Sequence, residues 1–128
     1  GDYKDSVKEQ PGSASVVQGV SEDKFSIGYS GIGYTTSNVK AIRLAKKAGE
    51  PFFAESYDNV LSGKYPLARY LYVYVAVDPY KSGSDKISPL TSEFLKFALS
   101  KEGQEVVVKD GYFPVPASVA KEEVKKIS

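Results

Sequence analysis

The stretch Tyr65-Pro66-Leu67-Ala68-Arg69-Tyr70-Leu71-Tyr72-Val73-Tyr74-Val75-Ala76-Val77 carries the strongest structural signal in the chain. Aromatic and β-branched residues fill positions 70–77, and such residues favour β-strands. A strand that is apolar on both faces is typical of the centre of a sheet covered on both sides. We therefore predict a central strand here, with Pro66 at its start, where a missing N–H does no harm.

Weaker patterns surround this stretch. Alternation of large and small residues predicts a strand over residues 25–34, and residues 39–45 fit either a strand or a helix. Ser56 and Ser88-Pro89 are typical helix starts, and Gly103 is expected to interrupt the helix that follows Ser88. Helical patterns cover residues 13–20, 56–61, 89–99, 104–109 and 118–127. This order of strands and helices favours an α/β architecture.

The composition excludes several classes of function. The 128 residues are 41% hydrophobic and 26% charged, as in a globular domain, and the net charge of +1 gives no basic bias toward nucleic acid. The absence of His and Cys removes Ser-His-Asp and Cys-His catalysis, disulfides and the usual zinc ligands. Because there is no Met, Gly1 is not a translational start, so we expect a processed chain or a piece of a longer one, with any signal or lipid anchor upstream.

The motifs of known chemistry are weak. Gly28, Gly31 and Gly33 are spaced G-x-x-G-x-G, which differs from the dinucleotide fingerprint, and they are interpreted as places where a strand bends or is closely approached. The carboxylates form no pair suited to acid–base catalysis and no calcium-loop spacing. We therefore expect no enzymatic activity, no metal and no cofactor.

Two positions are candidates for anion binding. Gly12, Ser13 and Ser15 follow Pro11 at a helix start, where free N–H groups and hydroxyls favour an anion. Simple capping by Ser13 or Ser15 is the alternative interpretation. Arg69, at the head of the predicted central strand, is suited either to an anionic ligand or to a structural salt bridge between two lobes.

Five segments in order resemble the C-terminal half of the phosphate-binding protein of the bacterial high-affinity phosphate ABC transporter. These segments are PGSASVVQGV (11–20), FSIGYSGIGY (25–34), NVLSGKYPLARYLYVYV (59–75), FLKFALSKEGQEVV (94–107) and GYFPVP (111–116). The resemblance covers nearly the whole chain. It implies part of a type 2, two-lobed periplasmic-binding-protein fold of the α/β class.

The resemblance also implies a division of the chain. Residues 1–64 would form the end of the second lobe, residues 65–69 the crossing between lobes, and residues 70–128 the completion of the first lobe. The main anion ligands of the family include an Arg followed by Ser-Gly-Thr, and no Ser-Gly-Thr occurs here. The chain alone is therefore expected to bind phosphate weakly.

The partners implied by the resemblance are inorganic phosphate or a similar oxyanion, bound by the full-length protein, and an ABC permease. Localisation would be periplasmic, or extracellular and membrane-anchored. Unpaired strand edges would favour association with the missing N-terminal half or a homodimer formed by strand exchange. A non-catalytic interaction or scaffold module built from the same fold segment is the alternative function.

Overall fold

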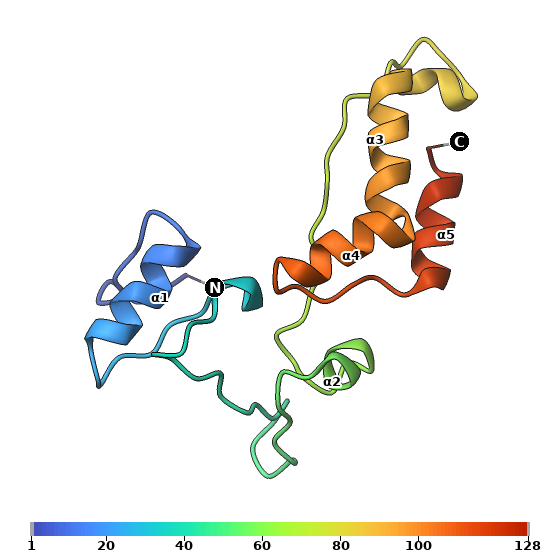
Figure 1. The fold of residues 1–128 in the computed structure, drawn as a ribbon. Helices are drawn as coiled ribbons and strands as arrows, with labels where there is room; N and C mark the ends of the chain where they lie inside the picture. Colours follow the sequence, from blue (N-terminus) through green and yellow to red (C-terminus); the bar gives the residue numbers. More distant parts are fainter. Residues whose placement is uncertain (1, 128) are drawn as a thin grey trace. The chain divides into compact units, whose positions relative to one another are not determined.

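The computed structural model describes residues 2–127 and divides the chain into two units, one ending at Leu67 and the other beginning at Ala68 (Figure 1). Each unit is described by itself. The described part of the first unit contains α1 (Ser13–Glu22), the 3-10 turn η1 (Ile32–Tyr34) and α2 (Tyr57–Leu61). That of the second contains the 3-10 turn η2 (Gly83–Lys86), α3 (Pro89–Leu99), α4 (Lys101–Lys109) and α5 (Ala117–Lys125).

A close approach between α1 and the segment that follows it organises the start of the first unit. A Cβ on Gly28 would lie 2.9 Å from methyl groups of both Val16 and Val20, so only glycine fits there without movement. The Ser30 hydroxyl donates to the Ser13 carbonyl at 3.1 Å. The expectation that the backbone at Gly28 is closely approached is confirmed.

The rest of the first unit is held by local hydrogen bonds. The predicted start of α2 is confirmed, because the Ser56 hydroxyl accepts from the Asn59 amide. Gly63 follows the helix with a φ of 67°, a conformation that glycine adopts without the penalty of a Cβ. Leu44 and Phe53 form an isolated antiparallel bridge with N···O distances of 2.9 and 2.8 Å.

The second unit is a cluster in which α3 contacts both α4 and α5 (Figure 1). The predicted start of α3 is confirmed: Pro89 is its first residue, and the Ser88 hydroxyl accepts from the Thr91 amide at 3.2 Å. Ile87, Ser92 and Ala120 are buried, and the Ser92 hydroxyl donates to the Ile127 carbonyl at 3.0 Å. This bond ties α3 to the end of the described chain.

The break between α3 and α4 falls at Ser100, so the expected interruption at Gly103 is wrong. Ser100 is extended, with a ψ of 168°, and its hydroxyl accepts from the Gly103 amide at 3.1 Å. Gly103 lies inside α4 and is buried. A Cβ at this position would collide with the Phe97 carbonyl oxygen and lie 2.8 Å from that of Ala98. The glycine is therefore needed for the close approach of two helices.

The start of α4 carries a pH-sensitive contact. Hydrogen bonds from the Glu102 amide and the Ser100 hydroxyl lower the pKa of Glu102 from its usual 4.5, with a smaller contribution from Lys101. Because the pKa of Glu102 is lower in the folded chain than in the unfolded chain, its ionised carboxylate stabilises α4 at any pH above the unfolded pKa. This stabilisation is lost as the pH falls through the folded pKa. We expect helical circular dichroism to decrease in this acid range, and Glu102→Gln to remove part of that decrease. Identical acid titrations of the two proteins would contradict this assignment.

The predicted strands do not form within the described residues. Residues 70–77 belong to no helix or strand, and Phe25, Ile27 and Tyr29 are exposed. On α3, the apolar side chains of Leu90, Phe94 and Phe97 are exposed as well. A strand needs hydrogen-bonding partners and a covered face, and no segment of residues 2–127 supplies them. The α/β architecture is therefore not seen in this chain by itself.

Candidate functional site

The start of α1 carries three of the four predicted anion-binding residues. Gly12 is the N-cap, with a φ of −176° and a ψ of 168°, and no side chain caps the helix. Ser13 and Ser15 lie inside the first turn, so the alternative in which one of them caps the helix is wrong. The first helical hydrogen bond runs from the Val16 amide to the Gly12 carbonyl at 3.1 Å. The amides of residues 13–15 therefore precede the helical ladder.

The electrostatics of this helix end favour a negative charge. Aligned peptide dipoles place partial positive charge at a helix N-terminus. The first turn of α1 contains no acidic residue that would neutralise it. The hydroxyls of Ser13 and Ser15 add neutral donors that can bond an oxyanion without bringing a full charge.

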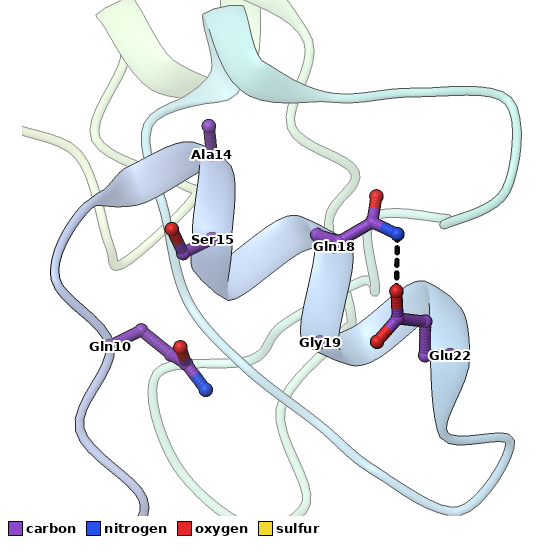
Figure 2. Close-up of a pocket in the computed structure, with 6 residues that line it drawn as sticks. All are labelled: Gln10, Ala14, Ser15, Gln18, Gly19 and Glu22. Carbon is purple, nitrogen blue, oxygen red and sulfur yellow. Dashed lines mark hydrogen bonds between the residues drawn. The ribbon is translucent and has the colours of Figure 1, made fainter.

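A groove of about 430 Å³ runs along one side of α1 from this end (Figure 2). Its lining residues are Gln10, Ala14, Ser15, Gln18, Gly19 and Glu22. The Gln18 amide nitrogen donates to the Glu22 carboxylate, which occupies that donor (Figure 2). Glu22 is seven residues beyond Ser15, about 10 Å along a helix, so its charge lies far from the first turn.

Arg69 belongs to the second unit, so the four predicted residues divide between the two units. Its Nη1 atom donates to the Tyr70 carbonyl at 3.4 Å, which is long for a hydrogen bond. Among the side chains that the structure describes, those of residues 84 and 85 not included, it forms no ion pair with a carboxylate. The structural salt bridge considered for Arg69 is therefore not seen, and its role as an anion ligand stays a prediction.

Sequence reasoning missed the amide side chains of the groove. Gln10 and Gln18 lie on either side of Pro11-Gly12 and the first turn, but glutamine on a helix surface is ordinarily interpreted as a solvated side chain. Their positions on either side of the predicted helix start are the only sign of them in the sequence.

No group of three or more metal-ligating side chains occurs among the residues that the structure describes. Nor, in the same residues, is any helix long and apolar enough to cross a bilayer.

Comparison with known proteins gives a consistent result. No protein-family model matches the chain. The Phosphate-binding protein PstS of Pseudomonas aeruginosa is 54% identical over 127 residues, which is 99% of this chain and 38% of that protein. PstS 2 of Streptococcus agalactiae is 33% identical over 96 residues, covering 75% of this chain and 28% of that protein. Protein SphX of Synechococcus elongatus is 33% identical over 106 residues, covering 80% and 29%.

These similarities identify the class as the phosphate-binding proteins, and the resemblance found in the sequence is confirmed. Within that class the chain is a relative of PstS along almost all of its length. The chain spans about 38% of the length of PstS of Pseudomonas aeruginosa. The relationship implies a periplasmic-binding-protein fold for the protein to which this sequence corresponds.

Proposed function

We propose that this chain is part of an extracytoplasmic receptor that binds phosphate and delivers it to an ABC permease. The identity of 54% over 99% of the chain with PstS of Pseudomonas aeruginosa carries the proposal. The receptor binds and releases its ligand without turnover. The lack of His and Cys, which removes the commonest nucleophile–base pairs, supports a binding function over catalysis.

The proposed fold is a two-lobed one to which this chain contributes two portions. Residues 1–64 form the end of the second lobe, residues 65–69 the crossing, and residues 70–128 the completion of the first lobe. Residues 70–77 then become a central strand, paired with strands from the sequence that the relatives have and this chain does not span. The apolar side chains that this segment exposes support such a covered position.

The first turn of α1 is the proposed contribution of the first unit to phosphate binding. Three amides that precede the helical ladder and two neutral hydroxyls match the acceptors of an oxyanion, and no first-turn carboxylate opposes it. Arg69 is proposed as a charged contribution from the second unit, since a guanidinium bonds an oxyanion through two donors. Two-lobed closure removes water from the anion and replaces it with such dipoles. The permease would then recognise the closed form.

The test is calorimetric titration with inorganic phosphate. The full-length protein is expected to bind, and the 128-residue chain to bind weakly or not at all, because most ligands of the family lie outside it. In the full-length protein, Ser15→Ala should weaken affinity about tenfold, since a hydrogen bond to a charged group contributes roughly 1.5 kcal/mol or more. Ser13→Ala and Arg69→Ala test the other two side chains in the same way.

Ser21→Ala is the matched control, because Ser21 lies on the same helix and its hydroxyl donates to the Gln18 carbonyl. Equal affinities of the Ser15 and Ser21 variants would exclude the Ser15 hydroxyl as a ligand. Tight phosphate binding by the 128-residue chain alone would overturn the proposed division of ligands. A full-length protein that binds a protein partner, with no phosphate-dependent thermal shift, would favour the interaction-module alternative.

A further inference from the structure

Two tyrosines that are distant in the sequence meet at their hydroxyl ends in the first unit. The Tyr3 and Tyr29 hydroxyls are 2.6 Å apart, a hydrogen bond in which either can donate. Their rings are nearly parallel, with 13° between the planes and 6.3 Å between the centroids. Tyr3 precedes α1 and Tyr29 follows it. The contact therefore joins the segment before this helix to the segment after it.

Neighbouring contacts fix the position of Tyr29. Gly28, the residue before it, packs directly on α1. The hydroxyl of Ser30, the residue after it, donates to the Ser13 carbonyl at 3.1 Å. All of these residues lie within positions 1–64, which the proposed fold assigns to one lobe. The tyrosine contact is thus internal to that stretch and does not depend on the exposure of either side chain.

The hydrogen bond also changes the acidity of Tyr3. It raises the pKa of Tyr3 above its usual value of 10.0, and the negative charge that Tyr29 acquires on ionisation raises this pKa further. Tyr3 therefore keeps its proton at neutral pH. Its oxidation is then the loss of one electron together with one proton.

We propose that Tyr3 and Tyr29 form a site of oxidative modification, at which a one-electron oxidant joins the two rings in a dityrosine cross-link. The oxidant is of the class that a haem peroxidase generates from hydrogen peroxide. This inference goes beyond the proposed function and involves no phosphate.

The reaction requires contact between two particular ring carbons. Each phenol loses one electron and one proton, and the two phenoxyl radicals form a carbon–carbon bond between the carbons ortho to their hydroxyls. The hydrogens on those two carbons move to the oxygens, which restores both hydroxyls. The two electrons and two protons released reduce one hydrogen peroxide to two waters. Each coupling carbon is adjacent to the carbon that bears the hydroxyl, so the contact between hydroxyls brings these carbons close together.

The contact gives this pair an advantage over the other tyrosines of the chain, which has ten in all. Two reacting groups that are held together react in an effectively unimolecular step. Coupling between tyrosines of different molecules requires an encounter, and its rate falls as the protein is diluted. In dilute solution the cross-link between Tyr3 and Tyr29 is therefore expected to be the main product.

The cross-link would enclose α1 in a covalent loop. Like a disulfide, it would restrict the unfolded chain and leave the folded contact in place. The thermal midpoint of unfolding is therefore expected to rise after oxidation. The first turn of α1, which is proposed to contact phosphate, lies inside this loop.

Oxidation by a haem peroxidase and hydrogen peroxide tests the proposal, in dilute solutions of the 128-residue chain and of the full-length protein. Both are expected to gain dityrosine fluorescence while remaining monomeric on a denaturing gel. Their mass should fall by two hydrogen atoms. Tryptic mapping of the oxidised 128-residue chain should yield a peptide of residues 1–4 joined to one of residues 25–40.

Phenylalanine variants assign the cross-link to the two rings. Tyr3→Phe and Tyr29→Phe should each lose it, because phenylalanine keeps the ring but cannot form a phenoxyl radical. Tyr34→Phe is the matched control, since it removes a phenol from the same segment but not from the stacked pair. This variant should form the cross-link as the wild type does. Unchanged helical circular dichroism is the folding control for all three.

A cross-link that persists in Tyr3→Phe, or is lost in Tyr34→Phe, would overturn the proposal. So would oxidation that yields only covalent dimers. A cross-link that forms in the 128-residue chain but not in the full-length protein would also overturn it, because the contact would then not belong to the complete lobe. The outcome is separable from that of the proposed function, because phosphate titration of the unoxidised full-length protein does not depend on this bond.

Discussion

Replacement of Gly103 by alanine is expected to lower the free energy of unfolding of the second unit by about 3 kcal/mol, near the upper end of overpacking costs. The added Cβ would collide with the Phe97 carbonyl oxygen and lie 2.8 Å from that of Ala98 and 2.9 Å from the Ala98 Cα. These are backbone atoms of α3, so no rotamer change relieves the contact. Loss of helical circular dichroism on thermal or urea unfolding measures the effect.

The matched control for Gly103 is Glu105→Ala in the same helix. The Glu105 carboxylate is exposed and lies 3.9 Å from the Lys101 ammonium, a separation typical of surface ion pairs of little net value. We expect its removal to change stability by less than about 0.5 kcal/mol. A Gly103→Ala protein as stable as Glu105→Ala would show that α3 and α4 do not meet as closely as described.

Gln104→Ala is expected to destabilise the second unit by about 2 kcal/mol, since two polar groups of the backbone lose their partners. The side chain joins two segments: its amide nitrogen donates to the Ala98 carbonyl at 2.8 Å, and its carbonyl oxygen accepts from the Val115 amide at 2.8 Å. It therefore holds the end of α3 and the connection that precedes α5 to the same turn of α4.

Gln18→Ala provides the comparison for Gln104, because Gln18 is also a helical glutamine but bonds only the exposed Glu22 side chain. Its removal should change stability by less than about 0.5 kcal/mol. Thermal unfolding of the two variants, followed by circular dichroism, measures the difference. Equal midpoints would show that the Gln104 bridge contributes nothing beyond a surface contact.

Helix starts could be predicted from the sequence because capping is local chemistry. Ser56 and Ser88 accept amide hydrogen bonds three residues ahead, and the pattern that produces those bonds is contained in a few positions. Gly103 was assigned wrongly for the opposite reason. Glycine is ordinarily interpreted as a helix breaker, whereas here its role depends on carbonyls of another helix. That contact is not encoded near Gly103 in the sequence.

Strands could not be confirmed because they depend on distant partners. The pattern of residues 70–77 predicts a strand, but a strand requires pairing with a second segment, and none of the described residues supplies one. The candidate site shows the same limit of local reasoning. Gly12, Ser13 and Ser15 lie at one helix start, as the sequence predicts. The side chains of Gln10 and Gln18 can be assigned to the groove only from the structure.

The exposure of the tyrosines in residues 70–77 has a practical consequence for experiments on this chain. Because the sequence contains ten tyrosines and no tryptophan, its ultraviolet emission comes from phenol rings alone. Three of those rings, Tyr70, Tyr72 and Tyr74, are close together in the sequence and exposed to solvent. Tyrosine fluorescence therefore reports, without an added label, whether these rings are exposed to solvent or covered.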